Sequence, residues 1–307
     1  MEVGQFQKDN INMAIIGIDL GGTNIKGVVM NTDGEVMHQH YIPTIDDKEG
    51  LWKSNVKEMV EFLKSNSQLE ITGIGLSAPG LPNDTNTAIA YLPDRLLGLE
   101  NFDWTTYFEQ KTYVINDAHS AAMAEYKFGV AKEFKTFVLL TLGTGVGGGI
   151  IINGQLYQGL SQMAGHLGHV SINHFDDERS ILGVPGSLEY AIGNYSVERR
   201  SFGKYKSTWE LVKDFEKGDH FASLIWLNSV KALATGINSF INMLSPEAIV
   251  LSGGITMADN ALYEPLQTFL DVLEFRPAGK QTAILQAHFG DMSGAIGAAS
   301  YVMDKEL

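Results

Sequence analysis

The most informative stretch of this sequence is Ile18-Asp19-Leu20-Gly21-Gly22-Thr23-Asn24-Ile25-Lys26-Gly27. Apolar, β-branched runs lie on both sides of its first glycines, over residues 14–20 and 25–30, so we expect two strands joined by a glycine turn. A third such run, residues 36–42, follows Asn31-Thr32-Asp33-Gly34, and Asp-Gly between apolar runs is a strong hairpin signal. The chain therefore opens with three predicted antiparallel strands.

The glycine turn has the chemistry of a phosphate-binding loop. A backbone without Cβ lets a phosphate approach closely and points successive N–H groups toward it. Asp19, just before the turn, would then lie close enough to hold Mg²⁺ through water. A similar turn, Gly143-Thr144-Gly145, follows a predicted strand over residues 136–142. Each turn alone is an ordinary hairpin, but two of them, the first preceded by an acid, favour the binding of one polyphosphate from both sides.

Two other nucleotide-binding patterns are excluded. Residues 143–148 fit G-x-G-x-x-G in form, but a Rossmann fingerprint needs a helix next, and residues 147–152 have the composition of a strand. The chain contains no G-x-x-x-x-G-K-[ST] motif, which excludes a Walker-type ATPase.

Strands and helices alternate through the rest of both halves. We expect helices where apolar residues recur at helical spacing and strands where apolar runs are short. The predicted helices cover residues 51–63, 118–128, 221–244, 262–273 and 291–303, and the further predicted strands cover 71–77, 88–92, 113–115, 147–152, 249–251 and 284–289. The repeated order of strand, glycine turn and strand indicates two related α/β lobes.

Two polar groups are candidates for the chemistry. Asn116-Asp117 follows a buried strand, where the ligands of α/β folds gather, and a carboxylate there can take the proton of an attacking hydroxyl. The alternative for Asp117 is a helix cap. His166, His169 and Glu189 can hydrogen-bond a polyhydroxylated ligand. The alternatives for the two histidines are a metal pair, for which only distant carboxylates could complete the ligands, and a purely structural role.

Composition excludes several classes of function. Asp and Glu number 36 against 22 Lys and Arg, and the net charge of −14 argues against a nucleic-acid or anionic-membrane partner. The chain has no Cys, so a disulfide, a thiolate metal site and a Cys nucleophile are impossible. No apolar run is long enough to span a bilayer, and residues 1–10 lack the apolar stretch of a signal peptide, so we expect a cytoplasmic protein.

Taken together, these motifs resemble one known family. The chain carries, in order, the stretch from Ile18 to Gly27, Ala78-Pro79-Gly80, Val114-Ile115-Asn116-Asp117-Ala118, Leu142-Gly143-Thr144-Gly145-Val146-Gly147-Gly148-Gly149, Ala164-Gly165-His166-Leu167-Gly168-His169 and Ile249-Val250-Leu251-Ser252-Gly253-Gly254. This ordered set is similar to that of the ROK family (repressor, open reading frame, kinase), within the superfamily of sugar kinases, actin and heat-shock ATPases. The resemblance covers residues 14 to about 300.

The resemblance implies a two-lobed, ribonuclease-H-like α/β fold (the actin-like ATPase and sugar kinase fold) that closes over ATP and a hexose. It implies an N-terminal lobe at residues 12–118 plus 290–307, because the C-terminal helix packs back on that lobe, and a C-terminal lobe at residues 119–289. The implied activity is ATP- and Mg²⁺-dependent phosphorylation of glucose or a close relative at the 6-hydroxyl, with Asp117 as the catalytic base.

The resemblance also assigns binding positions. The nucleotide-binding positions are Asp19, Gly21, Gly22, Thr23, Asn24, Gly143, Thr144, Gly145, Gly253 and Gly254. The sugar-binding positions are Gly80, Asn116, His166, His169 and Glu189.

Three positions of the chain depart from the family pattern. His166 stands where the family has a Glu that binds two sugar hydroxyls. A neutral imidazole offers one donor and one acceptor, so the preferred sugar stays open. His119 replaces a family Asn, and Asp94 lies near the position of a further sugar-binding Asn.

A fourth departure concerns zinc. The family's zinc segment corresponds to residues 180–189, where all three cysteines are missing. We therefore expect no zinc, a His169 released from metal binding, and a loop held by packing of Ile181, Leu182 and Leu188.

Other interpretations remain open. A ROK repressor carries a DNA-binding domain before the first turn; only 18 residues precede Asp19, which together with the negative charge argues against one. His166 suggests a catalytically weak protein that binds or senses sugar, whereas Asp117 and both intact turns argue for catalysis. A kinase for an N-acetylated or amino hexose is a further alternative. Because ROK proteins often dimerise, the resemblance extends to a homodimer, although the sequence reveals no interface.

Overall fold

A computed structural model describes residues 13–47 and 49–306. Residues 1–12, which include the stretch examined for a signal peptide, lie outside this range. The chain forms two compact units. Unit 1 comprises Met1–Lys132, Gln158–Met163 and Asp291–Leu307, and unit 2 comprises Glu133–Tyr157 and Ala164–Gly290.

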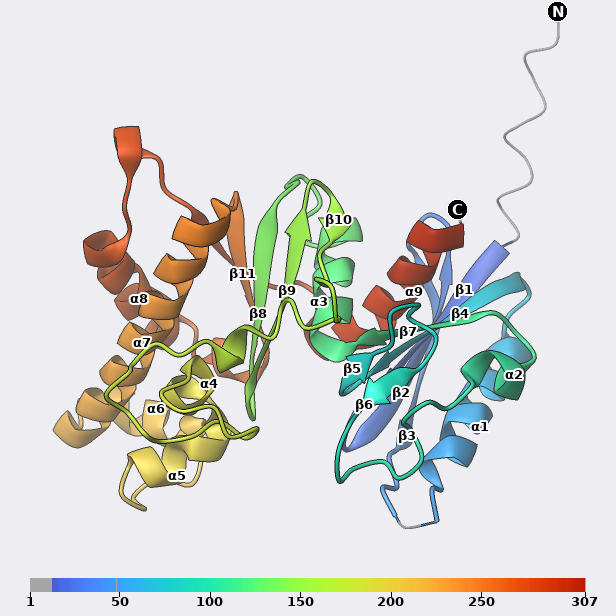
Figure 1. The fold of residues 1–307 in the computed structure, drawn as a ribbon, viewed down its shortest axis with the longest axis horizontal. Helices are drawn as coiled ribbons and strands as arrows, with labels where there is room; N and C mark the ends of the chain where they lie inside the picture. The colour runs from blue at the N-terminus through green and yellow to red at the C-terminus, as the bar shows by residue number, and fades with distance from the viewer. Residues whose placement is uncertain (1–12, 48, 307) are drawn as a thin grey trace, which may run out of the picture. The chain divides into compact units, whose positions relative to one another are not determined.

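Unit 1 contains a five-stranded sheet with the order β3-β2-β1-β4-β7 (Figure 1). Its strands are β1 (Met13–Leu20), β2 (Asn24–Asn31), β3 (Val36–Pro43), β4 (Glu70–Ala78) and β7 (Thr112–Asn116). The first three are antiparallel neighbours, as predicted, and β4 and β7 continue the sheet parallel to β1. The carboxyl ends of β1, β4 and β7 therefore meet at one edge.

Helices cover both faces of this sheet. Alternate residues of β1 point to opposite faces, so Ile16 and Ile18 join the core beneath α1 (Trp52–Asn66), whereas Gly17 faces α9 (Ser293–Glu306). Helix α9 packs against β1 and β4, next to which Figure 1 draws it. A Cβ added to Gly17 would lie 2.0 Å from a backbone oxygen of α9, so the glycine permits this close approach.

Helix α3 (Asp117–Lys127) packs along α9 and therefore belongs to unit 1. The expected boundary after residue 118 cut through this helix; the structure places the boundary after Lys132. Packing between helices that are far apart in the sequence, which no local pattern encodes, accounts for the difference. The remaining elements of unit 1 are short: β5 (Leu81–Pro82), β6 (Ile89–Tyr91) and α2 (Trp104–Phe108).

Unit 2 repeats the plan of unit 1. Its sheet has the order β10-β9-β8-β11-β12, with β8, β9 and β10 antiparallel and β11 and β12 parallel to β8. The strands are β8 (Phe137–Leu142), β9 (Val146–Ile152), β10 (Gln155–Leu156), β11 (Ala248–Ser252) and β12 (Ala283–Gln286). The prediction of two related α/β halves is confirmed by this shared order.

The core of unit 2 is built on two long helices, both predicted. Helices α7 (His220–Leu244) and α8 (Asn260–Leu273) pack on each other and contribute apolar side chains to one core with β8 and β11. Three shorter helices were not predicted: α4 (Leu188–Ile192), α5 (Val197–Arg200) and α6 (Thr208–Glu216). They lie in a region that carries few apolar repeats.

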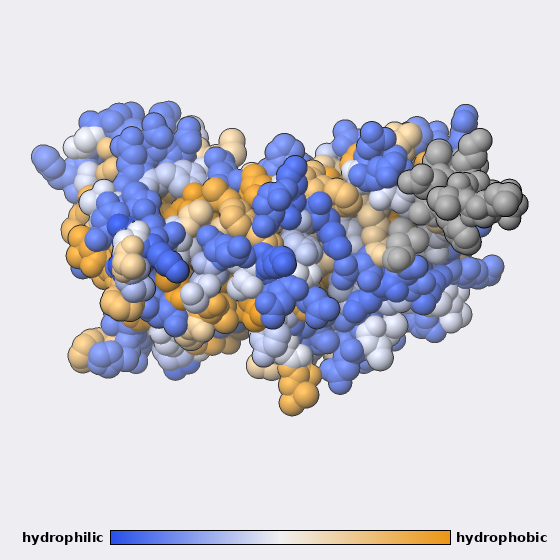
Figure 2. All heavy atoms as spheres, turned by 90° about the horizontal axis from the view of Figure 1, so that it is seen from above, coloured by the Kyte–Doolittle hydropathy of each residue, from blue (hydrophilic) through white to orange (hydrophobic). Residues whose placement is uncertain are grey.

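The surface is mainly polar. The face in Figure 2 is largely hydrophilic, with hydrophobic patches among the polar side chains. Among the residues that the structure describes, no helix combines the length and the apolar composition needed to cross a bilayer.

Candidate active site

The parallel strands of unit 1 bring polar side chains to one edge of its sheet. Asp19 lies beside Ser77 in the β1–β4 register, and Ala78 lies beside Asn116 in the β4–β7 register. Asp117 follows as the first residue of α3. The Ser77 hydroxyl donates to Oδ1 of Asp19 at 2.8 Å and thereby orients that carboxylate. The acid of the first turn and the expected base are thus grouped within one unit.

Asn116, and not Asp117, caps helix α3. Oδ1 of Asn116 accepts from the backbone N–H groups of Ala118 at 3.0 Å and His119 at 3.4 Å. Its Nδ2 donates to the backbone oxygen of Gly80 at 3.0 Å, which ties the helix start to the loop after β4. Asp117 is exposed, and its Oδ1 accepts the N–H of Ala118 at 2.8 Å. The cap that the sequence offered as an alternative role for Asp117 is thus Asn116. The His119 side chain is buried inside the unit.

The first glycine turn is an exposed connection between β1 and β2. The N–H of Gly21 donates to the oxygen of Asn24 at 3.2 Å and closes the turn. Thr44, just after β3, fixes it from the side. The Thr44 hydroxyl donates to the oxygen of Gly21 at 2.7 Å, and its N–H donates to the oxygen of Thr23 at 2.8 Å. These bonds hold the turn without any side chain at its glycines.

Electrostatics at this edge favour a bound cation. Burial raises the pKa of Asp19 to about 6; the hydrogen bond from Ser77 opposes this shift and the charge of Asp117 adds to it. Loss of hydration among the surrounding protein atoms also raises the pKa of Asp117, opposed by the N–H of Ala118 and then by the charge of Arg95. Two carboxylates that repel each other suit Mg²⁺, which prefers oxygen ligands and keeps several waters. The residues present therefore fit Mg²⁺ held by Asp19.

The second glycine turn, in unit 2, is tied to the segment after α4. Gly143 accepts from the N–H of Asn194 at 2.9 Å, and Thr144 accepts from the N–H of Tyr195 at 3.0 Å, both through backbone oxygens. Gly253 lies against the strand before the turn, with φ of 93°. A Cβ there would lie 2.4 Å from a backbone oxygen of β8, so only glycine fits. Unit 2 thus brings its predicted nucleotide-binding glycines together.

A cavity of about 560 Å³ opens beside this second turn. Gly143 and Thr144 line it together with Gly254, which begins the 3₁₀ helix η4 (Gly254–Ala258). Helix α6 supplies walls that the sequence did not predict: Trp209, Val212 and Lys213. The volume is that of a small-molecule site, and an exposed indole beside it can stack on a planar base.

The two predicted histidines lie side by side in unit 2. The rings of His166 and His169 are parallel within 4°, with centroids 6.4 Å apart. Burial lowers the pKa of His166, and the charge of His169 lowers it further, which favours the neutral imidazole. Gly168 between them packs on β9, where an added Cβ would lie 2.0 Å from a backbone oxygen. A neutral imidazole in this position can donate one hydrogen bond and accept one.

Glu189 holds two backbone segments of unit 2 together. Its Oε1 accepts from the N–H of Val146 at 3.2 Å, and its Oε2 accepts from the N–H of Ile181 at 2.9 Å. A Cβ added to Gly145 would lie 2.3 Å from Oε1, so the carboxylate also explains that glycine. The sequence indicated a sugar contact for Glu189; the structure adds this structural role, which leaves lone pairs for a ligand.

The prediction that apolar side chains hold the 180–189 loop by packing is wrong. Ile181 and Leu182 are 54% and 64% exposed, and only Leu188 of the three is buried. Hydrogen bonds hold the loop instead: the N–H of Ser180 donates to the oxygen of Val184 at 2.8 Å, and the N–H of Val184 donates to Oγ of Ser180 at 2.9 Å. A short turn closed by its own polar groups needs no apolar core. Within residues 13–47 and 49–306, no cluster of three metal-ligating side chains is present.

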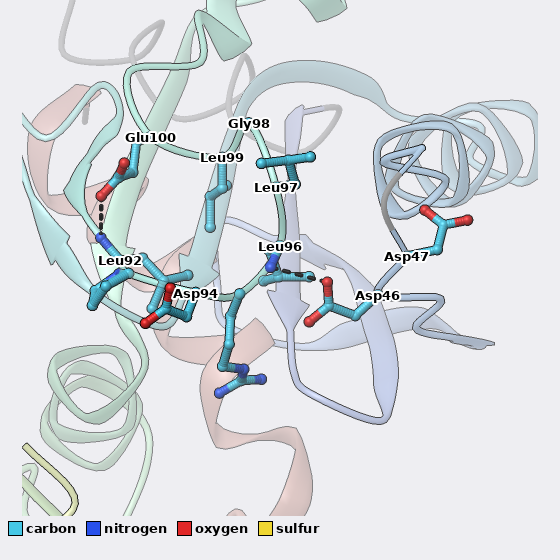
Figure 3. Close-up of a pocket in the computed structure, with 11 residues that line it drawn as sticks. Asp46, Asp47, Leu92, Asp94, Leu96, Leu97, Gly98, Leu99 and Glu100 are labelled. Carbon is cyan, nitrogen blue, oxygen red and sulfur yellow. Dashed lines mark hydrogen bonds between the residues drawn. The ribbon is translucent and has the colours of Figure 1, made fainter.

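Sequence analysis missed Arg95. It lies on the loop between β6 and α2, and a Cβ added to Gly22 would lie 2.7 Å from its Nη2. The neighbouring Asp94, with φ of 63°, lines a cavity of about 620 Å³ with Asp46 and Asp47 (Figure 3). No sequence signal marked this arginine, since its proximity to the first turn arises only on folding.

The fold and the site together define a class of protein. Each unit has a five-stranded sheet with the same strand order and a glycine turn between its first two long strands, which is the architecture of ribonuclease-H-like nucleotide-binding proteins such as the actin-like ATPases and sugar kinases. Within this class the chain belongs to the ROK family, whose family model matches residues 15–305.

Several relatives span almost the whole chain. The glucokinase of Halalkalibacterium halodurans is 29% identical over 317 residues, which cover 95% of either chain. The N-acetyl-D-glucosamine kinase of Haemophilus influenzae is 29% identical over 308 residues, which cover 94% of this chain and 99% of the relative. The crystal structure of the ROK hexokinase from Thermus thermophilus has a TM-score of 0.83 at 25% identity and covers 96% of this chain and 100% of that one.

Proposed function

We propose that this protein is a kinase that transfers the γ-phosphoryl group of ATP to a hydroxyl of a hexose or hexose derivative. One observation carries the proposal: Asp117 stands at the carboxyl edge of the unit 1 sheet, beside Asp19 and the first glycine turn, and leaves helix capping to Asn116. A carboxylate placed in this way is available for proton transfer.

The chemistry follows from the groups in each unit. Asp117 takes the proton of the sugar hydroxyl while the hydroxyl oxygen forms a bond to the γ-phosphorus. The bond from that phosphorus to the bridging oxygen of the β-phosphate breaks, and ADP is released. The raised pKa of Asp117 brings its basicity closer to neutral pH, where a general base works best. Mg²⁺ bound with the nucleotide would be held by Asp19 and would neutralise phosphate charge.

The two glycine turns supply backbone N–H groups for phosphate. In unit 2 the cavity beside the second turn takes the nucleoside, with Trp209 as the surface for the base. The sugar is assigned to Gly80, Asn116, His166, His169 and Glu189, and its class is a glucose-like hexose, phosphorylated at the 6-hydroxyl, or an N-acetylated or amino hexose. We place the reaction in the cytoplasm, where ATP is supplied, and expect a homodimer from family membership.

The test is an ADP-release assay across a panel of hexoses, amino hexoses and N-acetylated hexoses. For the sugar that is turned over, Asp117→Asn should lower kcat by at least about 100-fold, because the base is lost, while calorimetry shows unchanged sugar binding. Asp84→Asn, which alters an exposed carboxylate in the same unit, is the matched control and should turn over normally. Turnover by Asp117→Asn near that of the control would show that another base acts.

A further inference from the structure

The loop that carries Arg95 is anchored on both sides of that residue. Leu96 and Leu99 are each only 1% exposed and belong to the core of unit 1. The N–H of Leu96 donates to Oδ1 of Asp46 at 3.0 Å, and the N–H of Leu92 donates to Oε1 of Glu100 at 2.7 Å, as Figure 3 shows. These anchors fix the backbone that presents Arg95.

The backbone around Arg95 is strained. Asp94 and Leu96 have φ of 63° and 46°, in the left-handed region that a bulky residue such as leucine rarely adopts. Such a conformation persists only where the surroundings enforce it, and it is found most often at functional sites. Here it buries the Leu96 side chain while Arg95 stays exposed.

The Arg95 guanidinium lies beside the first glycine turn. Its Nη2 lies 2.7 Å from the position that a Cβ on Gly22 would take. Its positive charge lowers the pKa of Asp117. Across the described part of the chain, Arg95 makes no ion pair or hydrogen bond with the protein, whereas nearby Lys26 donates to the backbone oxygen of Asp291 at 2.7 Å.

We propose that Arg95 binds the γ-phosphoryl group of the nucleotide and stabilises it during transfer. The inference rests on the proposed kinase function. Asp19 and Asp117 repel an approaching phosphate, and the Arg95 guanidinium beside the first turn offsets this charge. A guanidinium also matches the oxygens of a phosphoryl group with several N–H donors in one plane. Arg95 stays protonated throughout; the proton of the sugar hydroxyl goes to Asp117.

The first test measures binding without turnover. Calorimetry should show that Arg95→Gln binds AMPPNP with Mg²⁺ at least about 10-fold more weakly than the wild type but binds ADP equally well, because only the γ-phosphoryl contact is lost. Arg95→Lys should recover part of the affinity. Lys132→Gln removes another exposed positive charge of unit 1 and should bind both nucleotides normally. An unchanged ratio of AMPPNP to ADP affinity in Arg95→Gln would overturn the proposal.

The second test uses turnover. Arg95→Gln should lower kcat by about 100-fold or more, with the KM for sugar unchanged. A change confined to the KM for sugar would place Arg95 on the sugar and overturn the proposal. If the wild type phosphorylates no sugar in the panel while Arg95→Gln still loses its preference for AMPPNP, the kinase function fails and the phosphate site stands.

Gly22→Ala provides a third test through the same contact. Its Cβ would displace the Arg95 guanidinium, which lies at the end of a flexible side chain, so the fold should be retained. The variant should lose AMPPNP affinity as Arg95→Gln does, and the double variant should be no worse than either single one. Fully additive losses would mean that the added methyl group blocks phosphate by itself and that Arg95 acts elsewhere, which contradicts the proposal.

Discussion

Folding raises the pKa of two carboxylates, those of Asp19 and Asp117. Burial is the largest cause of the raised pKa of Asp19, and the charge of Asp117 adds to it. A group whose pKa rises on folding binds its proton more tightly in the folded state. Ionised Asp19 therefore costs stability when no cation is bound; in the proposed function the charge is needed because it would hold Mg²⁺.

Replacing Asp19 with asparagine tests this cost. The pKa of Asp19 is about 6 in the fold against an ordinary value of 3.8, so its stabilising contribution is complete below pH 3.8 and lost as the pH rises through 6. Asparagine keeps an acceptor for Ser77 and carries no charge. At pH 8 without divalent cations, Asp19→Asn should raise the free energy of unfolding by up to about 3 kcal/mol, measured by urea denaturation.

The same variant provides its own control at low pH. Near pH 3.5 the gain in stability from Asp19→Asn should shrink toward zero, since the wild-type side chain is then protonated in both states. An equal gain at both pH values would mean that packing, and not charge, explains the effect. Kinase turnover should be lost in either case.

Among the secondary-structure elements, α9 packs very closely on one face of the unit 1 sheet. Gly17 and Gly75 lie on adjacent strands and face this helix. At the start of α9, Gly294 abuts Asp19: an added Cβ would lie 2.4 Å from Cγ of that residue. The glycines therefore both allow the helix to pack and shape the surroundings of the buried acid.

A methyl group at Gly75 should disturb this packing. The Cβ of Gly75→Ala would lie 2.1 Å from the backbone oxygen of Ala298, which cannot move without shifting α9. We expect the free energy of unfolding to fall by about 2 kcal/mol or more. Gly254→Ala is the control, because an added Cβ there meets no atom within 4 Å. Similar stability of the two variants in urea would contradict the packing argument.

At the scale of the whole molecule, the two units hold their glycine turns in the same way. Each places a glycine turn between two antiparallel strands and stiffens it from a later segment: Thr44 binds the first turn, and Asn194 and Tyr195 bind the second. The glycines of the turns thus lack side chains, while hydrogen bonds hold the turn backbone in place. If the turns bind phosphate as proposed, this fixed backbone is preorganised, which lowers the entropic cost of binding.

The metal content of the whole protein is a further prediction. Hydrogen bonds hold the 180–189 loop, and its cysteines are absent. Elemental analysis should therefore find no stoichiometric zinc, and EDTA should leave the Tm unchanged within about 1 °C, because no structural metal contributes to folding. One zinc per chain would show that the loop has ligands which this account lacks.

Local patterns in the sequence were enough to predict the long strands and helices. Residues 14–20, 25–30 and 36–42 predicted β1, β2 and β3, and the apolar repeat of residues 221–244 predicted α7. Alternation and helical periodicity report which face of an element is buried, and that information is local. Short helices such as α4 and α6 have too few turns to produce a clear repeat.

The candidate site was predictable only in part, because several of its features depend on residues that meet on folding. Glycine turns and the Asn116-Asp117 pair are local signals at strand ends, so their positions could be predicted. That Asn116 takes the cap, that Glu189 bonds two backbone segments, and that Arg95 reaches Gly22 depend on contacts between distant segments. Hydrogen bonding and charge act through space, and only the folded chain brings these groups within their range.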